Sequence, residues 1–287
     1  MMGKRERKKM WIVAAGVILI FVGVAVFFRI PFSPTKAQFK RMVLGSVETA
    51  AVPSAIFTEA DIERLPIPVQ RYFLYCRYLG TSKMAYMKAC LRDVDFVMSA
   101  SRTVKIDYTQ FNLVERPVRY AQISSSLFSI PFEGLDFYRN GVGSMKGTLA
   151  KIIPLFDQRG EDMNRACLVT WLAECLMVPH AALQDFVKWE PIDDTHAKAS
   201  ILWKGISASG VFAFSKAGEL LAFRTADRVA VDMEGKERKA EWSAYFRAYH
   251  PINGVLQPKI IQSVWHYPEG DCVYFNQNEA AVVIQYH

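Results

Sequence analysis

The chain has 287 residues, of which 51% are hydrophobic and 22% are charged. This composition can bury a sizeable core and excludes intrinsically disordered and fibrous proteins. The formal net charge of +7 is concentrated near the N-terminus, because residues 1–41 hold nine Lys and Arg residues against Glu6 alone, a net +8. Residues 42–287 therefore carry a net charge of −1, and we expect no nucleic-acid partner.

An uncharged segment, residues 11–28 (WIVAAGVILIFVGVAVFF), follows a basic N-terminal tail at residues 1–10. As a helix the segment would span roughly 27 Å, close to the ~30 Å hydrocarbon core of a bilayer. A cleaved signal peptide should end in small residues, whereas this segment runs into the bulky stretch 26–31 (VFFRIP). The sequence therefore predicts an uncleaved, single-pass membrane anchor. The positive-inside bias favours a cytoplasmic N-terminus and an extracytoplasmic body.

The chain after the anchor divides into a juxtamembrane connector at 29–57 and one expected β-rich domain at 58–287. The connector contains a short helical pattern at 37–47 among its prolines. Two helical regions are predicted in the domain, near 58–79 and 161–186. Thr58 supplies an N-terminal cap for the first, and Gly80 ends it. The second has apolar residues at every fourth position, namely Met163, Cys167, Trp171 and Cys175.

Alternating apolar and polar residues predict strands along most of the domain, beginning at about residue 85. The clearest runs are 104–109, 118–127, 132–139, 144–153, 197–203, 206–214, 221–223, 242–249, 255–266, 271–276 and 280–286. Lys204-Gly205 and Asn253-Gly254 are typical of two-residue hairpin turns, so neighbouring strands should be antiparallel. We predict an α+β, mostly β fold: a curled antiparallel sheet of about eleven strands, a half-barrel, with helices on or over its concave face.

One polar cluster is a candidate for chemistry. The stretch 189–196 (WEPIDDTH) places three carboxylates and an imidazole within seven residues. Glu190, Asp194 and His196 are the candidate catalytic residues, as an acid/base pair or as ligands of a divalent cation. The same residues are also explained by a turn in which the aspartates accept bonds from local backbone N–H groups. Both interpretations stay open at this point.

A second candidate set is aromatic. A curled sheet covered by a helix can hold an apolar ligand between the two, and large inward-facing side chains would contact it. The same side chains are equally suited to fill a solid core. The candidate ligand-binding residues are Trp171, Trp203, Phe212, Phe214, Phe223, Trp242 and Trp265.

Two motifs that would indicate other chemistry are not matched. The glycines of 141–147 (GVGSMKG) fit neither nucleotide-binding spacing and lead into a predicted strand, so a hairpin turn explains them. The five cysteines show no metal-binding spacing, and Cys167 and Cys175 would lie roughly 12 Å apart on one helix, too far for a disulfide. We expect no cofactor and no metal.

Four stretches resemble a bacterial single-pass membrane family that is known only as a domain of unknown function. They are 65–73 (LPIPVQRYF), 162–174 (DMNRACLVTWLAE), 189–197 (WEPIDDTHA) and 249–258 (YHPINGVLQP). The resemblance covers about 60–287 and implies no established activity. The order of elements, with the hairpin Tyr-x-x-x-Asn-Gly-x-x-x-Pro, is also similar to the periplasmic lipoprotein-carrier (LolA-like) half-barrel. That likeness implies an open half-barrel, covered by helices, that shelters acyl chains.

The leading functional hypothesis is a membrane-anchored, extracytoplasmic protein that binds a lipid or another apolar ligand without catalysis. Its partners would be the bilayer, through residues 11–28, and the bound ligand. The first alternative is a hydrolase or metal-dependent enzyme that uses Glu190, Asp194 and His196. The second alternative is a structural or partner-binding ectodomain with a filled core. The volume on the concave side of the sheet separates these hypotheses.

Overall fold

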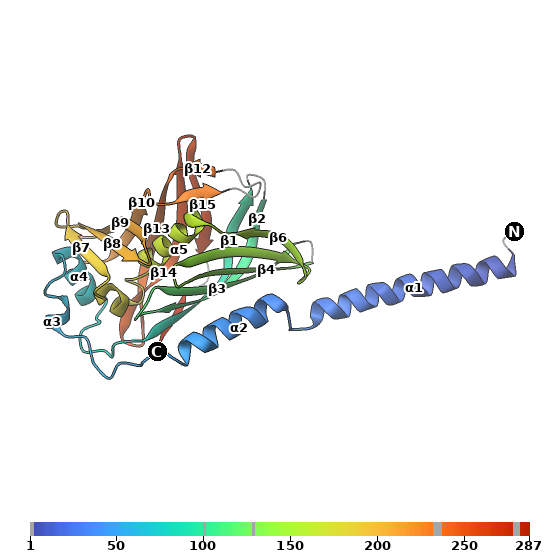
Figure 1. Cartoon of the computed structure of the whole chain (residues 1–287), viewed down its shortest axis with the longest axis horizontal. Helices are drawn as coiled ribbons and strands as arrows, with labels where there is room; N and C mark the ends of the chain where they lie inside the picture. Colours follow the sequence, from blue (N-terminus) through green and yellow to red (C-terminus); the bar gives the residue numbers. More distant parts are fainter. Residues whose placement is uncertain (1–2, 100–101, 128–129, 232–236, 278–281) are drawn as a thin grey trace.

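The computed structural model describes residues 3–99, 102–127, 130–231, 237–277 and 282–287. Its N-terminal helix α1 (Lys4–Arg29) extends away from the body and buries none of its residues (Figure 1). By length and composition it is apolar enough to cross a membrane, as an anchor or a signal sequence would be. The helix includes the basic segment that we expected as a separate tail, because Lys and Arg are good helix formers.

The connector folds into a second helix, α2 (Pro34–Val47), which lies against the outer face of the sheet (Figure 1). Ser33 caps it by accepting a bond from the backbone N–H of Lys36 at 3.1 Å. Val43 packs on Tyr120 in a small cluster separate from the main core. The hydroxyls of Ser46 and Tyr120 lie 2.8 Å apart. The connector is therefore held firmly on the body rather than acting as a loose linker.

One long antiparallel sheet dominates the body. Fourteen strands belong to it, in the order β6-β5-β4-β3-β2-β1-β15-β14-β13-β10-β9-β8-β7, with β16 paired to β1. Its first arm contains β1 (Tyr86–Ser99), β2 (Arg102–Leu113), β3 (Val118–Leu127), β4 (Ile130–Arg139), β5 (Val142–Leu149) and β6 (Ile153–Gln158).

The second arm and the centre of the sheet come from the C-terminal half of the chain. They contain β7 (Val187–Pro191), β8 (His196–Trp203), β9 (Ile206–Phe214), β10 (Leu220–Thr225), β13 (Glu241–Ile252), β14 (Val255–Tyr267), β15 (Gly270–Gln277) and β16 (Val283–Tyr286). Two short strands, β11 (Val229–Val231) and β12 (Glu237–Lys239), form a separate ribbon near the top of the view in Figure 1.

The predicted fold class, an open curled antiparallel sheet with helices, is confirmed. The sheet has more strands than the eleven predicted, because short strands such as β6 and β7 pair at its edges without a full alternating pattern. The hairpin turns predicted at Lys204-Gly205 and Asn253-Gly254 are present, with positive φ at all four residues. Residues 280 and 281 of the last predicted strand lie outside the described residues, and β16 supplies residues 283–286.

Four helical elements occupy the concave side or one end of the sheet: α3 (Glu59–Ile62), α4 (Ile67–Tyr75), α5 (Glu161–Ala173) and the 3-10 turn η1 (Pro179–Leu183). Helix α5 contacts β3, β4 and β5 in one arm and β8 and β9 in the other. It therefore bridges the two arms across the open side of the half-barrel (Figure 1). Gly143 permits this close approach, because a Cβ there would stand 2.8 Å from the Cys167 sulfur and 2.8 Å from the Met163 carbonyl oxygen.

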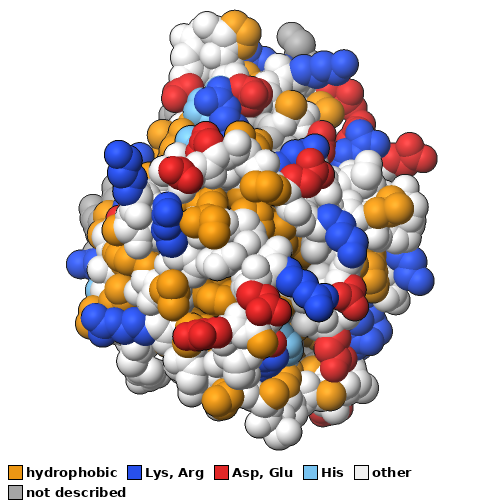
Figure 2. Space-filling model, turned by 90° about the vertical axis from the view of Figure 1, so that its left-hand side faces the viewer, with side chains coloured by type: hydrophobic (Ala, Val, Ile, Leu, Met, Phe, Trp, Pro, Cys, Tyr) orange, Lys and Arg blue, Asp and Glu red, His pale blue; other side chains and the backbone are white. Residues whose placement is uncertain are grey.

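The surface agrees with the balanced charge of the body. Figure 2 shows the end of the molecule that carries α3 and α4, where basic and acidic side chains alternate with apolar ones and no patch of one sign forms. Several ion pairs join neighbouring strands on the surface, for example Arg224 with Glu241 and Lys105 with Asp95. Such exposed pairs contribute little to stability. The stability of the fold must come from its interior.

A cavity beneath helix α5

A cavity of about 660 Å³ lies between α5 and the concave face of the sheet. This volume falls within the range of ligand-binding pockets in proteins. Its walls come from β1 to β6, from β13 to β15 and from α5, with the β11–β12 ribbon at one side. Apolar side chains form most of the walls, including Phe96, Phe132, Phe156, Trp265 and Phe275.

The space exists because two central strands present small residues there. Ala244 on β13 and Ser263 on β14 are direct cross-strand partners, and both line the cavity. On the opposite wall, Gly147 leaves room for the ring of Phe156 to lie across β5, since a Cβ would come within 2.4 Å of that ring. The aromatic side chain therefore covers the wall without filling the centre.

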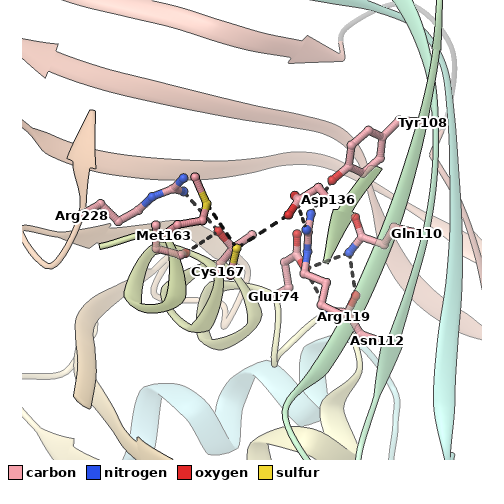
Figure 3. Close-up of polar contacts among 11 residues, drawn as sticks. Tyr108, Gln110, Asn112, Arg119, Asp136, Met163, Cys167, Glu174 and Arg228 are labelled. Atoms are coloured by element: carbon pink, nitrogen blue, oxygen red, sulfur yellow. Dashed lines mark hydrogen bonds and ion pairs between the residues drawn. The ribbon is translucent and has the colours of Figure 1, made fainter. Parts of the chain in front are cut away.

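Buried charges form one side of the cavity (Figure 3). Arg119 on β3 is 3% exposed and donates to Asp136 at 2.6 Å, to Glu174 at 2.9 Å and to the Tyr108 hydroxyl. Burial lowers the pKa of Arg119, but Glu174, Tyr108 and Asp136 together raise it by more, so the guanidinium stays charged. For the Tyr108 hydroxyl, burial raises the pKa, so this group stays neutral. This network fixes α5 to β2, β3 and β4.

Two amides complete the network around Glu174. The side chains of Gln110 and Asn112, both on β2, donate to the same carboxylate oxygen that Arg119 reaches, each at 2.8 Å. Glu174 follows the last turn of α5, so these bonds hold the C-terminal end of that helix. With three donors, the carboxylate is well compensated for its burial.

A second arginine lies on the other side of the cavity. The guanidinium of Arg228 stands over the rings of Trp242, at 4.4 Å, and Trp265, at 5.4 Å, both within cation–π range. One terminal nitrogen donates to the Thr170 hydroxyl on α5 at 3.2 Å. Its Nε is buried and has no hydrogen-bond partner among the described residues. Figure 3 shows Arg228 on the opposite side of Met163 and Cys167 from the Arg119 network.

Sulfur atoms separate the two arginines. The Cys167 thiol lies 3.6 Å from the sulfur of Met163 and 3.7 Å from a carboxylate oxygen of Asp136. Burial raises the pKa of Cys167, and the nearby Asp136 raises it further. The residue is therefore a protonated, weakly nucleophilic thiol at neutral pH. It contributes an apolar, polarizable surface to the cavity.

The predicted aromatic residues divide between the cavity and the core. Trp242 and Trp265 line the cavity. The other five are packed elsewhere, because α4, η1 and the second arm fill that part of the concave side: Trp171, Trp203, Phe212, Phe214 and Phe223. Phe212, for example, packs between Trp189, in a tilted contact at 5.1 Å, and Phe223, in an edge-on contact at 4.7 Å.

The predicted polar cluster forms a surface turn. His196 begins β8, and its Nδ1 lies 3.0 Å from the carboxylate of Asp193, not from that of Asp194. Asp193 also accepts the backbone N–H of Thr195 at 2.7 Å, and that bond is the main reason why the pKa of Asp193 is lowered to about 2. Asp194 contributes its main-chain carbonyl to Arg71.

Glu190, the third candidate of the cluster, is an exposed residue of β7. Its carboxylate lies 4.0 Å from the ammonium of Lys198 on the adjacent strand. Among the residues that the structure describes, no group of three His, Cys, Asp or Glu side chains is arranged to hold a metal ion. The turn interpretation accounts for the contacts among Asp193, Thr195 and His196.

Sequence reasoning did not identify the two cavity arginines. Arg119 stands in the run 118–121 (VRYA), where strand alternation places it opposite to Tyr120 and therefore on the inner face. A charged residue on the inner face of a buried strand is the signal that would have singled it out. Arg228 lies between two strands, and no pattern in the sequence marks it.

Two of three comparisons relate the chain to known proteins. The search of curated proteins gives no match. The chain is similar to the crystal structure of a LolA superfamily protein from Nitrosomonas europaea, with 6% identity, a TM-score of 0.38, and coverage of 76% of this chain and 90% of that one. Residues 55–277 match the model of a family of unknown function, which confirms the resemblance drawn from the sequence motifs. The chain belongs to the DUF6544 family.

Proposed function

We propose that this protein is a membrane-anchored binding protein, and that residues 58–287 form a domain that holds a lipid or another apolar ligand beneath α5. The observation that carries the proposal is the cavity of about 660 Å³ with mainly apolar walls. Proteins hold small apolar ligands in concave sites of this size, with mainly apolar walls and a few polar groups. A few polar groups at its edges would orient the ligand.

The junction between the anchor and the body supports action at a membrane surface. Lys151, in the turn between β5 and β6, donates to the carbonyl oxygens of Phe27 at 2.7 Å and Ile30 at 2.6 Å, at the C-terminal end of α1. The neighbouring Ile152 and Ile153 are 65% and 51% exposed. We propose that α1 stays in the membrane with its N-terminus in the cytoplasm, since five basic residues precede the apolar segment within six positions.

The contacts favour binding over the hydrolase hypothesis. His196 and Asp193 lie on an exposed turn of the second arm, in the β7–β8 connection, and neither lines the cavity. Asp136 and Glu174, which line the cavity, accept hydrogen bonds from Arg119, so their negative charges are paired. The cavity also favours binding over a structural ectodomain with a filled core.

The test is a measurement of ligand occupancy on the full chain in nanodiscs. Native mass spectrometry should detect a lipid that remains bound to the protein after its release from the nanodisc. The delipidated protein should then bind 1-dodecanol, with protein-free nanodiscs as the background. The Ala244→Leu/Ser263→Leu variant, which fills the cavity from β13 and β14, should lose this binding. Equal dodecanol binding by this variant and by the original chain would contradict the proposal.

A further inference from the structure

We propose that Arg228 binds the anionic end of the ligand, so that the cavity selects a single-chain amphiphile that ends in a carboxylate or a phosphate. This inference rests on the proposed function and specifies its ligand class. Three features carry it: the cationic side chain lines the cavity, it lacks an acidic partner in the described part of the chain, and one of its N–H groups is buried without an acceptor.

The other two arginines that line the cavity already have acidic partners. Arg119 is paired with Asp136 and Glu174, and Arg238 is paired with Glu269. Arg228 instead has the neutral Thr170 hydroxyl as the hydrogen-bond partner that the structure shows. A partly buried positive charge beside apolar walls is unfavourable unless an anion compensates it. A ligand anion at this point would supply that compensation.

The donors of the guanidinium that remain unused suit an oxyanion. The guanidinium lies over the rings of Trp242 and Trp265, and these contacts use none of its N–H bonds. One terminal nitrogen donates to the Thr170 hydroxyl, and the buried Nε–H has no acceptor among the described residues. The Nε edge of an arginine can bind two oxygens of a carboxylate or a phosphate side by side.

The rest of the cavity fits an acyl chain. Phe132, Met145 and Phe156, on β4, β5 and β6, form an apolar wall on the first arm of the sheet, whereas Arg228 is held by β13, β14 and α5. A ligand whose charged end reaches Arg228 would therefore place its chain along β4 to β6. The ion-paired Arg119 network provides no unpaired donor of this kind.

The experiment compares three probes with the same twelve-carbon chain on the full protein in nanodiscs: dodecanoate, dodecyl phosphate and 1-dodecanol. The original chain should bind at least one of the two anions about tenfold more tightly than the alcohol, because hydrogen bonds to charged groups are the strong ones. Arg228→Gln should abolish this preference, because it should weaken binding of the anions about tenfold more than binding of dodecanol. The matched control, Arg224→Gln, removes a surface arginine paired with Glu241 and should alter neither affinity.

The outcomes separate this inference from the proposed function. Loss of dodecanol binding together with anion binding in Arg228→Gln would show that Arg228 only clamps α5, and would overturn the inference. Equal affinity of the original chain for all three probes would also overturn it, while leaving the binding function intact. If no probe binds, the proposed function fails as well.

Two further comparisons complete the test. A preference for dodecanoate over dodecyl phosphate assigns a fatty-acid-like ligand, and the reverse assigns a phosphorylated one. Arg228→Lys retains the charge but loses the planar guanidinium and its Nε donor, so it should keep a reduced preference for anions. A Lys variant with no preference would show that the planar donor edge carries the recognition, and a fully retained preference would contradict that role.

Discussion

The two arms of the sheet fill their concave side in different ways. In the second arm, Phe212, Phe214 and Phe223 point inward and meet Tyr72 of α4 and Trp189 of β7 in a continuous aromatic core. Towards the first arm, the inward positions of β13 and β14 are small at Ala244 and Ser263, and the space beneath α5 stays open. The small side chains of Ala244 and Ser263 therefore contribute to the open space on this side of the sheet.

The covering elements reinforce this difference. The second arm has α4 and η1 packed into it, and Tyr72 donates from α4 to the carbonyl oxygen of Leu176 at 2.7 Å. On the first arm α5 alone crosses the opening among the described elements, held at its C-terminal end by the Arg119 network. We propose that the second arm mainly stabilises the fold and that the side of the sheet beneath α5 binds the ligand. The predictions below test this assignment.

The largest expected effect is a loss of stability from a substitution in the second arm, whose concave side is filled by aromatic side chains. Phe212→Ala should lower the free energy of unfolding by about 3–5 kcal/mol, because it leaves a void among close-packed rings. Phe96→Ala, at the cavity wall, should cost clearly less, since one side of that ring already faces open space. Urea unfolding of the full chain in nanodiscs, followed by near-UV circular dichroism, measures both. Equal losses would mean that the two arms do not differ in packing.

The second prediction tests how the first arm, beside the cavity, is stabilised. Glu174→Ala removes the carboxylate that Arg119, Gln110 and Asn112 share. It should destabilise the fold by about 3 kcal/mol, since the buried donors are left without their acceptor. The control Glu241→Ala breaks an exposed pair with Arg224 and should cost less than about 1 kcal/mol. A similar cost for both variants would show that the polar network contributes little beyond a surface ion pair.

These two arms also explain what the sequence could and could not predict. Alternation and hairpin turns are local, so most strands of both arms and turns such as Asn253-Gly254 were predicted, whereas β7 was missed and β5 and β6 were predicted as one run. The amphipathic pattern around Trp171 likewise predicted α5. Which arm would be filled depends on α4 and η1 reaching the second arm, a contact between distant segments that no local pattern encodes.

The site residues follow the same logic. Trp242 and Trp203 look equivalent in the sequence, as inward-facing aromatics of β13 and β8. Trp203 packs against Phe186 at 5.1 Å, whereas Trp242 faces the cavity and Arg228. Arg228 was missed because its position depends on the approach of α5 and β14 from other parts of the chain. Local chemistry marks candidates, but tertiary contacts decide their roles.

A third prediction applies one substitution to both arms. Ala199→Leu, on β8 in the filled arm, should destabilise by about 1–3 kcal/mol through overpacking. Ala244→Leu, on β13 beside the cavity, should leave stability within about 1 kcal/mol because the added atoms enter open space. It should also weaken dodecanol binding, which Ala199→Leu should not. Thermal unfolding and the nanodisc binding measurement check these outcomes, and the reverse pattern would place the free volume in the other arm.

The smallest effect concerns the reactivity of two cysteines. Cys272 on β15 lines the cavity, whereas Cys90 on β1 does not, and both are partly exposed. Burial raises the pKa of Cys272, so its thiolate fraction and its alkylation rate should increase as the pH rises above neutral. At pH 8, dodecanoate should slow iodoacetamide modification of Cys272 several-fold and leave the rate at Cys90 unchanged, as peptide mass spectrometry would show. Equal protection of both residues would point to a general stabilisation of the fold rather than to a ligand in the hollow arm.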